Sequence, residues 1–477
     1  MLELKSLNSA RVFDFFKTLS AIPHGSGNMK GIADYCEGFA KEHNLKYIRD
    51  AADNVVIFKN GTDGYENSDP VILQGHLDMV CQKTPDCNID FEKDGLDLYI
   101  DGDFIKAHGT TLGADNGIAV AMVLSILESN SIAHPPIEAV FTVDEEIGML
   151  GAMALDMSQL HGRQMINLDS EEDNVVTVSC AGGSDFKLNI PLNKIKCQGA
   201  AVTIDINGLL GGHSGVEINK NRVNANMIAG RVLNALDGFE IISINGGDKP
   251  NAIPNRCVIE LCVKDADAFC VAAKQQLEII KAEIADRECG FTPEIVVNNN
   301  GKFDCFDKKT ADKLIYTLLC VPNGITEMSA DIKGLVQTSL NLGVLMTDAD
   351  SMTLHFALRS NKKSALAFLE QRLCAFFDRL DWHHQEFGHY PPWEYKADSK
   401  LRDIYCDIYK ETFGKSPSVE AIHAGLECGV FASALDGIDC IAIGPTMYDV
   451  HTVNERLSIS STENFYNLIL KTLTRLK

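Results

Sequence analysis

A histidine and a carboxylate, separated by one residue, close the mostly apolar run VILQGHLDMV at residues 71–80. If this run is a strand, its side chains alternate between faces, so His76 and Asp78 point the same way. An imidazole beside a carboxylate is the usual arrangement of a metal-ligating histidine and the group that orients it. A satisfied histidine at a strand terminus is the alternative interpretation, and this motif alone favours that simpler one.

Acidic residues also follow two further apolar runs. IEAVFTV at 137–143 leads into Asp144, Glu145 and Glu146, and MINL at 165–168 leads into Asp169. In open α/β sheets, ligands bind outside the carboxyl ends of the strands. We therefore expect these carboxylates to lie near His76 at one edge of a sheet.

Asp115 and His451 complete the set of candidate ligands. Asp115 stands where the glycine-rich segment GTTLGADNG gives way to an apolar helix, and a helix N-terminus favours a negative side chain. A simple capping role explains Asp115 equally well. His451 follows the GPT segment at 444–446, after the last apolar strand-like run of the chain.

Together these strand-end residues offer two imidazoles and several carboxylates, and no thiolate. Such nitrogen and oxygen donors suit zinc, cobalt or manganese, and one carboxylate between two metal ions can bridge them. Paired ions of this kind activate a water molecule for attack on a carbonyl group. The pattern therefore indicates a catalytic centre for hydrolysis.

Two separated segments must form the domain that positions these residues. Residues 1–185 and 396–477 alternate apolar strand-like runs with amphipathic helical stretches, which predicts an α/β catalytic domain with a central mixed sheet flanked by helices. Residues 186–395 interrupt this domain. Their own alternation of strands and helices predicts an inserted α+β lid domain, built from two α+β halves.

Composition excludes several classes of protein. The 477 residues carry 43 basic and 66 acidic side chains, so the net charge of −23 disfavours nucleic acid and anionic membranes as partners. The fifteen cysteines are scattered without a CxxC pair, which favours reduced thiols and argues against a cysteine zinc cluster. With no signal peptide and no apolar run of membrane length, the chain is expected to be soluble and cytoplasmic.

Seven motifs, in this order, carry a resemblance to a known family. GHLDMV, GTTLGADNG, DEEIGMLGA, NLDSEED, GGHSG, HAGLECG and the GPT segment before His451 resemble the M20 metallopeptidases, specifically their aminoacyl-histidine dipeptidase (Xaa-His dipeptidase) branch. The resemblance runs from about residue 20 to the C-terminus. It implies two divalent metal ions, zinc first, with cobalt or manganese as alternatives.

The resemblance also assigns roles around the metal ions. Glu145, beside a ligand without being one, would be the general base, and Asp78 would orient His76. The ligands would be His76 and Asp169 for one ion, Glu146 and His451 for the other, and Asp115 as the bridge between them.

Further residues would contact the substrate. His213 in GGHSG would donate to the oxyanion, Arg359 would pair with the substrate carboxylate, and Asn251 would also contact substrate. Gly425 and Glu427 in HAGLECG would present backbone N–H groups and a carboxylate to the two ends of a dipeptide. Without the resemblance, His213 is interpreted as an ordinary loop histidine, and Arg359 as a solvated surface residue. The histidines at 383, 384 and 389 are interpreted as surface residues.

The predicted function is therefore a two-metal dipeptidase that cleaves unblocked dipeptides, with Xaa-His substrates among them. An N-acyl-amino-acid deacylase or a tripeptide aminopeptidase would share the metal chemistry. A metal-dependent binding protein without catalysis is the alternative from another class, and Glu145 argues against it because a binder needs no base. Both a monomer and a homodimer remain open.

Overall fold

The structure is a computed structural model that describes residue 4 and residues 6–477. The chain forms two compact units. The first comprises Met1–Ser179, Tyr395–Ala421 and Leu426–Lys477, and the second comprises Cys180–Glu394 and Ile422–Gly425. The boundary expected between residues 185 and 186 falls inside the strand Gly182–Pro191, and a short piece of the HAGLECG loop belongs to the second unit.

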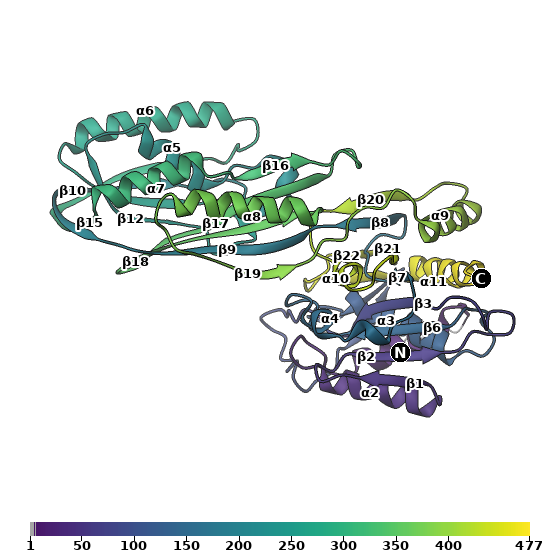
Figure 1. The fold of residues 1–477 in the computed structure, drawn as a ribbon. Coiled ribbons are helices and arrows are strands. Elements are labelled where there is room, and N and C mark those ends of the chain that lie inside the picture. The colour runs from purple at the N-terminus through teal and green to yellow at the C-terminus, as the bar shows by residue number, and fades with distance from the viewer. Residues whose placement is uncertain (1–3, 5) are drawn as a thin grey trace. The chain divides into compact units, whose positions relative to one another are not determined.

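An eight-stranded mixed sheet forms the centre of the first unit (Figure 1). Strands β3, β6, β7 and β21 run parallel at its middle, whereas β1 and β2 pair antiparallel. In spatial order the strands are β1 (Lys46–Arg49), β2 (Val55–Lys59), β6 (Ile137–Thr142), β3 (Val71–His76), β7 (Gln164–Asn167), β21 (Asp439–Ala442), β8 (Val175–Cys180) and β20 (Ser418–Ile422).

Every residue of β3 and β6 is buried, which explains their mostly apolar sequence, because central parallel strands are covered on both faces. Helix α3 packs on β3, and α1 packs on α3. The helices of this unit are α1 (Ala10–Ser20), α2 (Lys30–Glu42), α3 (Ala114–Glu128), α4 (Leu150–Ala154), α9 (Lys400–Phe413), α10 (Glu427–Ala434) and α11 (Ile459–Arg475). A small second sheet joins β22 (Met447–Tyr448), β23 (Arg456–Ser458), β5 (Phe104–Ala107) and β4 (Leu98–Asp101).

A nine-stranded sheet forms the second unit, and its strands pair antiparallel. The two expected halves meet where β12 pairs with β17, with Gly246 opposite Leu345, so they share one continuous sheet. The spatial order is β15 (Glu294–Phe306), β10 (Lys194–Ile206), β14 (Cys257–Val263), β12 (Phe239–Gly246), β17 (Val336–Thr347), β18 (Ser351–Ser360), β9 (Gly182–Pro191) and β19 (His384–Tyr390), with β16 (Gly324–Met328) beside β17. The short strands β11 (Gly212–His213) and β13 (Ala252–Ile253) pair separately.

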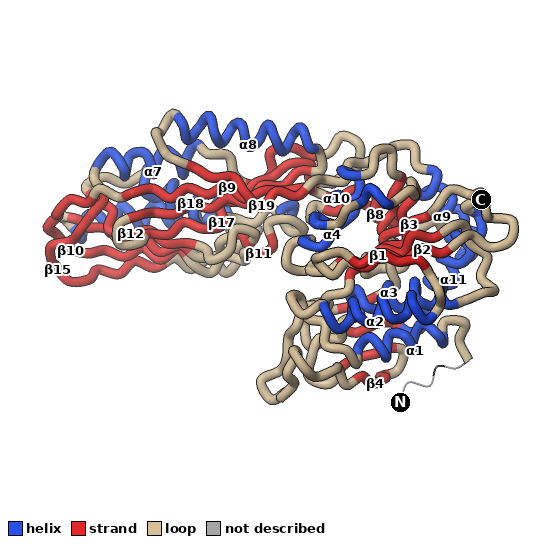
Figure 2. Tube along the Cα trace, turned by 60° about the horizontal axis from the view of Figure 1, so that its bottom comes forward, coloured by secondary structure: helices blue, strands red, loops and turns tan. Residues whose placement is uncertain are grey.

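Four helices lie along one face of this second sheet (Figures 1 and 2). They are α5 (Ala225–Asn234), α6 (Ala266–Ile284), α7 (Lys308–Cys320) and α8 (Lys363–Asp378). Buried side chains between these helices and the sheet, including Phe186, Phe356 and Phe377, form one apolar core. The predicted fold class, a mixed α/β sheet domain with an inserted α+β domain, is confirmed.

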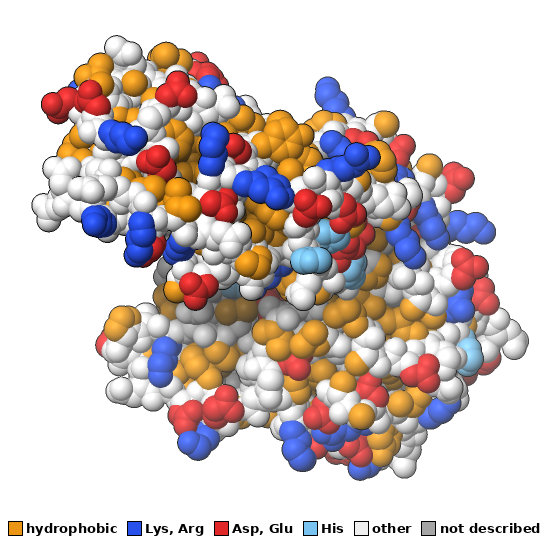
Figure 3. Space-filling model, turned by 60° about the vertical axis from the view of Figure 1, so that its left-hand side comes forward, with side chains coloured by type: hydrophobic (Ala, Val, Ile, Leu, Met, Phe, Trp, Pro, Cys, Tyr) orange, Lys and Arg blue, Asp and Glu red, His pale blue; other side chains and the backbone are white. Residues whose placement is uncertain are grey.

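Acidic and basic side chains are interspersed over the face drawn in Figure 3. In the part of the chain that the structure describes, no helix has the length and apolar character that a membrane span requires. Among the described residues, no cysteine forms a disulfide bond.

Candidate metal centre

His76 is the last residue of β3 and is almost completely buried. Its Nε2 atom lies 3.2 Å from Asp115 Oδ1 and 3.6 Å from Asp169 Oδ1. On the other side of the ring, Nδ1 lies 3.0 Å from the main-chain carbonyl oxygen of Asp78. With Nδ1 donating to that carbonyl group, Nε2 is free to ligate a metal ion beside the two carboxylates.

Asp115 lies between the two imidazoles at the start of α3. Its Oδ1 atom faces His76, and its Oδ2 atom lies 3.0 Å from Nε2 of His451. The backbone is not helical at this residue (φ −82°, ψ 103°), and the Asp115–Asn116 peptide bond is cis. One carboxylate thus touches both histidines, which come from positions 375 residues apart in the chain.

His451 also lies beside a second acid. Its Nε2 atom is 2.8 Å from Glu146 Oε1. Ligand atoms therefore converge in two adjoining sets, within 4.8 Å of one another in each: His76, Asp115 and Asp169 in one, and Asp115, Glu146 and His451 in the other. The two sets share Asp115.

Burial and crowding among like charges shift the pKa values of these acids. Burial, reinforced by the charge of Asp115, raises the pKa of Asp169 to about 6. Burial likewise raises the pKa of Glu145 well above its ordinary value, although His76 opposes the shift. The carboxylates of Asp115 and Glu146, which lie beside the ring, raise the pKa of His451 to about 11. The centre therefore holds more negative charge than its two histidines neutralise.

A pair of divalent cations fits this arrangement. The donors are nitrogen and oxygen atoms only, which suits zinc, cobalt or manganese. Glu146 Oε1 is buried and makes no hydrogen bond among the described residues, although the His451 ring lies 2.8 Å away. Buried acceptors normally have a partner, and a metal ion bound by both Glu146 Oε1 and His451 Nε2 would supply one.

Asp78 does more in the structure than face His76. Its Oδ1 atom lies 3.4 Å from His76 Nδ1 and accepts a hydrogen bond of 2.9 Å from the backbone N–H of Glu145. Its Oδ2 atom accepts from the N–H of Glu146 at 3.2 Å and from the Ser26 hydroxyl at 2.8 Å. The buried Asp78 carboxylate therefore fixes the backbone that carries the candidate base and a candidate ligand.

Asn116 is a supporting residue that sequence reasoning missed. Its Oδ1 atom accepts from the backbone N–H of His76 at 3.2 Å, and its Nδ2 donates to the carbonyl oxygen of Leu168 at 2.8 Å. The side chain thereby joins the chain at His76 to the segment just before Asp169. Its position directly after Asp115 was the only signal in the sequence.

Glu455 was also missed. Its buried carboxylate accepts from the N–H groups of Leu112 at 2.8 Å and Ala114 at 2.9 Å, and so holds the segment that leads into Asp115. Burial raises its pKa to about 7, against the effect of these hydrogen bonds. No local pattern marks Glu455, because its partners lie more than 300 residues earlier in the chain.

Glu427 is placed differently from the prediction that its carboxylate meets one end of a dipeptide. The side chain is fully buried, accepts a hydrogen bond of 2.7 Å from the Thr142 hydroxyl, and also accepts from Gln74 Nε2. Burial raises its pKa to about 7. Its Oε2 atom joins the ends of β3 and β6, and its Oε1 atom is buried without a hydrogen-bond partner among the described residues.

His213 in the second unit has a defined tautomer. The backbone N–H groups of Gly215 and Val216 each donate to Nδ1 at 3.2 Å, so Nδ1 carries no hydrogen and the proton of the neutral ring resides on Nε2. Burial and the positive charge of Arg359 lower the pKa of His213. The ring is therefore a neutral donor through Nε2.

The other predicted substrate residues of the second unit are Arg359, Asn251 and Gly425. Arg359 donates through Nη1 to the Tyr390 hydroxyl at 2.8 Å, while its buried Nε makes no hydrogen bond within the described part of the chain. Asn251 is exposed, and its carbonyl oxygen accepts from Ser214, the residue after His213, at 2.8 Å. Gly425 is partly exposed at the end of the piece Ile422–Gly425.

His423, in the same short piece, also lies near Arg359 and His213. Burial, followed by the charges of those two residues, lowers its pKa to about 3. Its ring is hydrogen bonded to Ser339 Oγ at 2.7 Å and to Asn361 Oδ1 at 3.0 Å. The second unit therefore gathers an arginine and two uncharged histidines.

The sheet, the candidate ligands at its strand ends and the inserted unit are together typical of a metallopeptidase. Residues 72–475 match the model of peptidase family M20/M25/M40, so the chain belongs to this family. The predicted family is thus confirmed.

Two relatives match along the whole chain. The cytosol non-specific dipeptidase of Escherichia coli is 36% identical over 483 residues, which is 99% of each chain. The crystal structure of aminoacylhistidine dipeptidase from Vibrio alginolyticus has a TM-score of 0.90 and 34% identity, covering 99% of this chain and 98% of that one. The aminopeptidase PepT of Bacillus cereus, at 15% identity and a TM-score of 0.57, shares the fold.

Proposed function

We propose that this chain is a two-metal dipeptidase that hydrolyses the peptide bond of unblocked dipeptides. The observation that carries the proposal is the Asp115 carboxylate between the rings of His76 and His451, with an acid of raised pKa, Glu145, beside them. The two full-length relatives are both dipeptidases by name, which supports the same reaction.

Five side chains would hold the two cations. His76 and Asp169 would bind one ion, Glu146 and His451 the other, and Asp115 both. When bound, the cations supply a Lewis acid for the scissile carbonyl group and acidify the attacking water. We propose zinc as the metal. Cobalt and manganese are alternatives, because nitrogen and oxygen donors accept all three ions.

Glu145 would act as the general base. Its carboxylate would take a proton from the attacking water and pass that proton to the leaving amine. Burial raises the pKa of Glu145, and two bound cations would favour its ionised form, which is the form that a base needs. Asp78 would hold Glu145 in position through its backbone N–H.

The second unit would supply groups for the substrate. His213 would donate from Nε2 to the oxyanion, and the neutral ring with its bonded Nδ1 suits that role. Arg359 would pair with the substrate carboxylate, and the Tyr390 hydroxyl would fix the guanidinium group. Asn251 and a backbone N–H of Gly425 are proposed as further substrate contacts.

The proposal extends to substrate range, location and assembly. The names of the two relatives favour a broad dipeptidase that includes Xaa-His substrates, acting in the cytoplasm. A tripeptide aminopeptidase or an N-acyl-amino-acid deacylase would use the same metal chemistry. Whether the protein is a monomer or a homodimer stays a prediction with both forms open.

A substrate panel tests the proposal. Purified protein with added zinc or manganese should cleave dipeptides, Xaa-His types included, faster than the matching tripeptides or N-acetylated amino acids. Faster cleavage of tripeptides or acylated amino acids would overturn the dipeptidase assignment. The variant Glu145→Gln should retain both metal ions and lose turnover by about 100-fold or more. If that variant keeps full activity, the proposed mechanism is wrong.

A further inference from the structure

A second group of metal-binding side chains lies between α8 and β19 in the second unit. Glu370, Cys374 and Asp378 are spaced by four residues on α8, so they lie along one face of the helix. The helix thus presents a thiol flanked by two carboxylates.

Strand β19 presents a matching row. His384 and Glu386 are two residues apart and share one face of the strand. A bulge then inserts one residue, because Phe387 lies opposite Asp185 and Tyr390 lies opposite Gly183. The extra residue shifts the alternation of side chains by one position. His389 therefore lies on the same face of the strand as His384 and Glu386.

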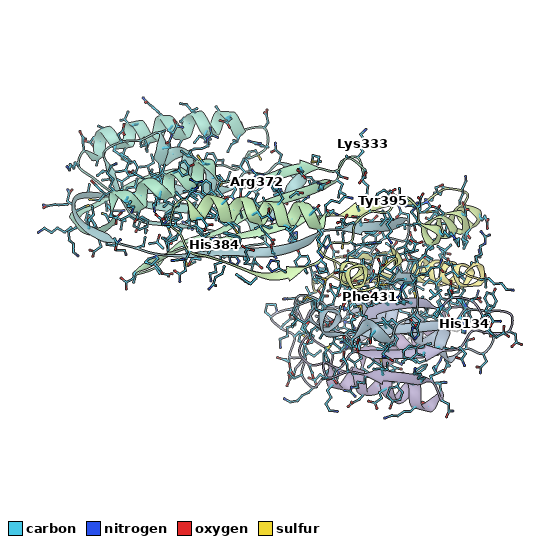
Figure 4. The ribbon with its side chains drawn as sticks, in the orientation of Figure 1. His134, Lys333, Arg372, His384, Tyr395 and Phe431 are labelled. Atoms are coloured by element: carbon cyan, nitrogen blue, oxygen red, sulfur yellow. The ribbon has the colours of Figure 1, made fainter. Side chains whose placement is uncertain are left out.

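The two rows meet in three contacts. Cys374 Sγ donates to Glu386 Oε1 at 2.9 Å, His384 Nε2 lies 3.3 Å from Asp378 Oδ1, and His389 Nε2 lies 3.1 Å from Glu370 Oε1. Figure 4 labels His384 of β19 and Arg372 of α8. Helix and strand therefore touch through ligand-type side chains at three successive levels.

At the middle level the ligand atoms form a compact set. One atom each of Cys374, His384 and Glu386 lies within 4.8 Å of the others. The ligands of a tetrahedral zinc ion are separated by about 3.5 Å, so small side-chain movements would bring these three into its coordination sphere.

The environment of His384 suits a metal ligand. Its side chain is only 17% exposed, which corrects the interpretation of this residue as a surface histidine, and its ring stacks on Phe186 with centroids 4.9 Å apart. Its Nδ1 atom is buried and makes no hydrogen bond among the residues that the structure describes. Ligation through Nδ1 would leave Nε2–H to donate to Asp378, the usual way in which a carboxylate orients a metal-bound histidine.

We propose that Cys374, His384 and Glu386 bind a zinc ion that joins α8 to β19, with a water molecule in the fourth position. One thiolate, one imidazole and one carboxylate form a donor set that suits zinc, and no role in the proposed dipeptidase reaction uses these residues. On binding, the Cys374 S–H bond breaks, a zinc–sulfur bond forms, and the proton passes to solvent.

The thiol is protonated before zinc binds. Burial and the neighbouring Glu386 carboxylate raise the pKa of Cys374 to about 12. Zinc must therefore displace a proton that is hydrogen bonded to another of its own ligands. Such displacement is ordinary for structural zinc sites, where binding releases protons.

The site would stabilise an edge of the second sheet. Strand β19 stands at the end of the strand order and, within the described part of the chain, pairs with β9 alone. It ends at Tyr390, whose hydroxyl accepts a hydrogen bond from Arg359. A zinc ion between α8 and β19 would thus hold the strand whose last residue fixes this arginine.

Cobalt(II) substitution tests the site without depending on enzymatic activity. A cobalt–thiolate bond gives an intense charge-transfer absorption in the near ultraviolet, which the nitrogen and oxygen donors of the candidate metal centre do not produce. The full chain loaded with Co²⁺ should show this band. Cys374→Ser should abolish it, and Cys197→Ser, which removes another thiol of the second unit, should keep it. Absence of the band in the unmodified chain, or its loss in the control alone, would overturn the proposal.

Zinc analysis gives a second readout. Protein purified without chelator should carry one more zinc ion per chain than its Cys374→Ser variant, which should keep both ions of the candidate metal centre. Glu386→Gln, at an exposed position where folding is less at risk, should weaken zinc binding at this site by about 10-fold or more. Equal zinc content in the unmodified chain, Cys374→Ser and Glu386→Gln would refute the site. Neither result bears on whether the candidate metal centre is catalytic.

Discussion

Replacing Asp78 tests whether its carboxylate orients His76 or holds the backbone of Glu145 and Glu146. Sequence reasoning assigned Asp78 to orient His76, whereas the structure shows that the main-chain carbonyl oxygen of Asp78 lies closer to His76 Nδ1 than its carboxylate does, at 3.0 Å against 3.4 Å. The carboxylate instead accepts hydrogen bonds from the N–H groups of Glu145 and Glu146. Asp78→Asn should therefore disturb the general base more than the His76 ligand.

The expected size follows from these hydrogen bonds. The amide of Asp78→Asn retains one acceptor oxygen, and its NH₂ group cannot accept, so one partly buried N–H of the Glu145–Glu146 backbone loses its partner. A buried donor without a partner costs about 1–3 kcal/mol. If that cost falls on the transition state, turnover drops roughly 5- to 150-fold. His76 keeps its main-chain partner and should keep its metal ion.

Turnover and metal content should be measured on the same preparations. Asp78→Asn should show lower kcat with two zinc ions still bound at the candidate metal centre, whereas His76→Ala should lose one of them. Ser26→Ala removes only the hydroxyl donor to Asp78 and should change kcat by less than Asp78→Asn does. Loss of a metal ion from Asp78→Asn, to the same extent as from His76→Ala, would refute this reasoning and make Asp78 a ligand.

Two further predictions concern single residues. His213→Ala should reduce kcat by about 100- to 1,000-fold while both metal ions remain bound, since one oxyanion donor contributes about 2.7–4 kcal/mol; unchanged kcat would remove His213 from the reaction. Burial raises the pKa of Glu427 from 4.5 to about 7, so the folded state keeps a proton that the unfolded state loses across this window. In metal-free protein, the contribution of Glu427 to the free energy of unfolding should therefore fall by up to about 3 kcal/mol as pH rises from 4.5 through 7, and Glu427→Gln should remove this part of the pH dependence in urea titrations.

Local sequence was sufficient to predict the elements that carry the site. The apolar runs before His76, Glu145 and Asp169 are buried strands, because central parallel strands are covered on both faces. A run of neighbouring apolar residues is enough to show this pattern in the sequence. The helix that begins near Asp115 follows from a glycine-rich segment next to an apolar one. Strand ends of one parallel sheet meet at one edge, so sequence alone also suggested that these acids gather.

Contacts between distant segments were decided only by the tertiary structure. The sharing of Asp115 by His76 and His451, the hold of Glu455 on the segment before Asp115, and the burial of Glu427 against Thr142 all join residues far apart in the chain. Such pairs depend on the register and packing of whole elements, which leave no periodic signal near either partner. The same holds for Cys374 and His384, which face each other because a helix and an edge strand pack together, with a bulge that no local pattern predicted.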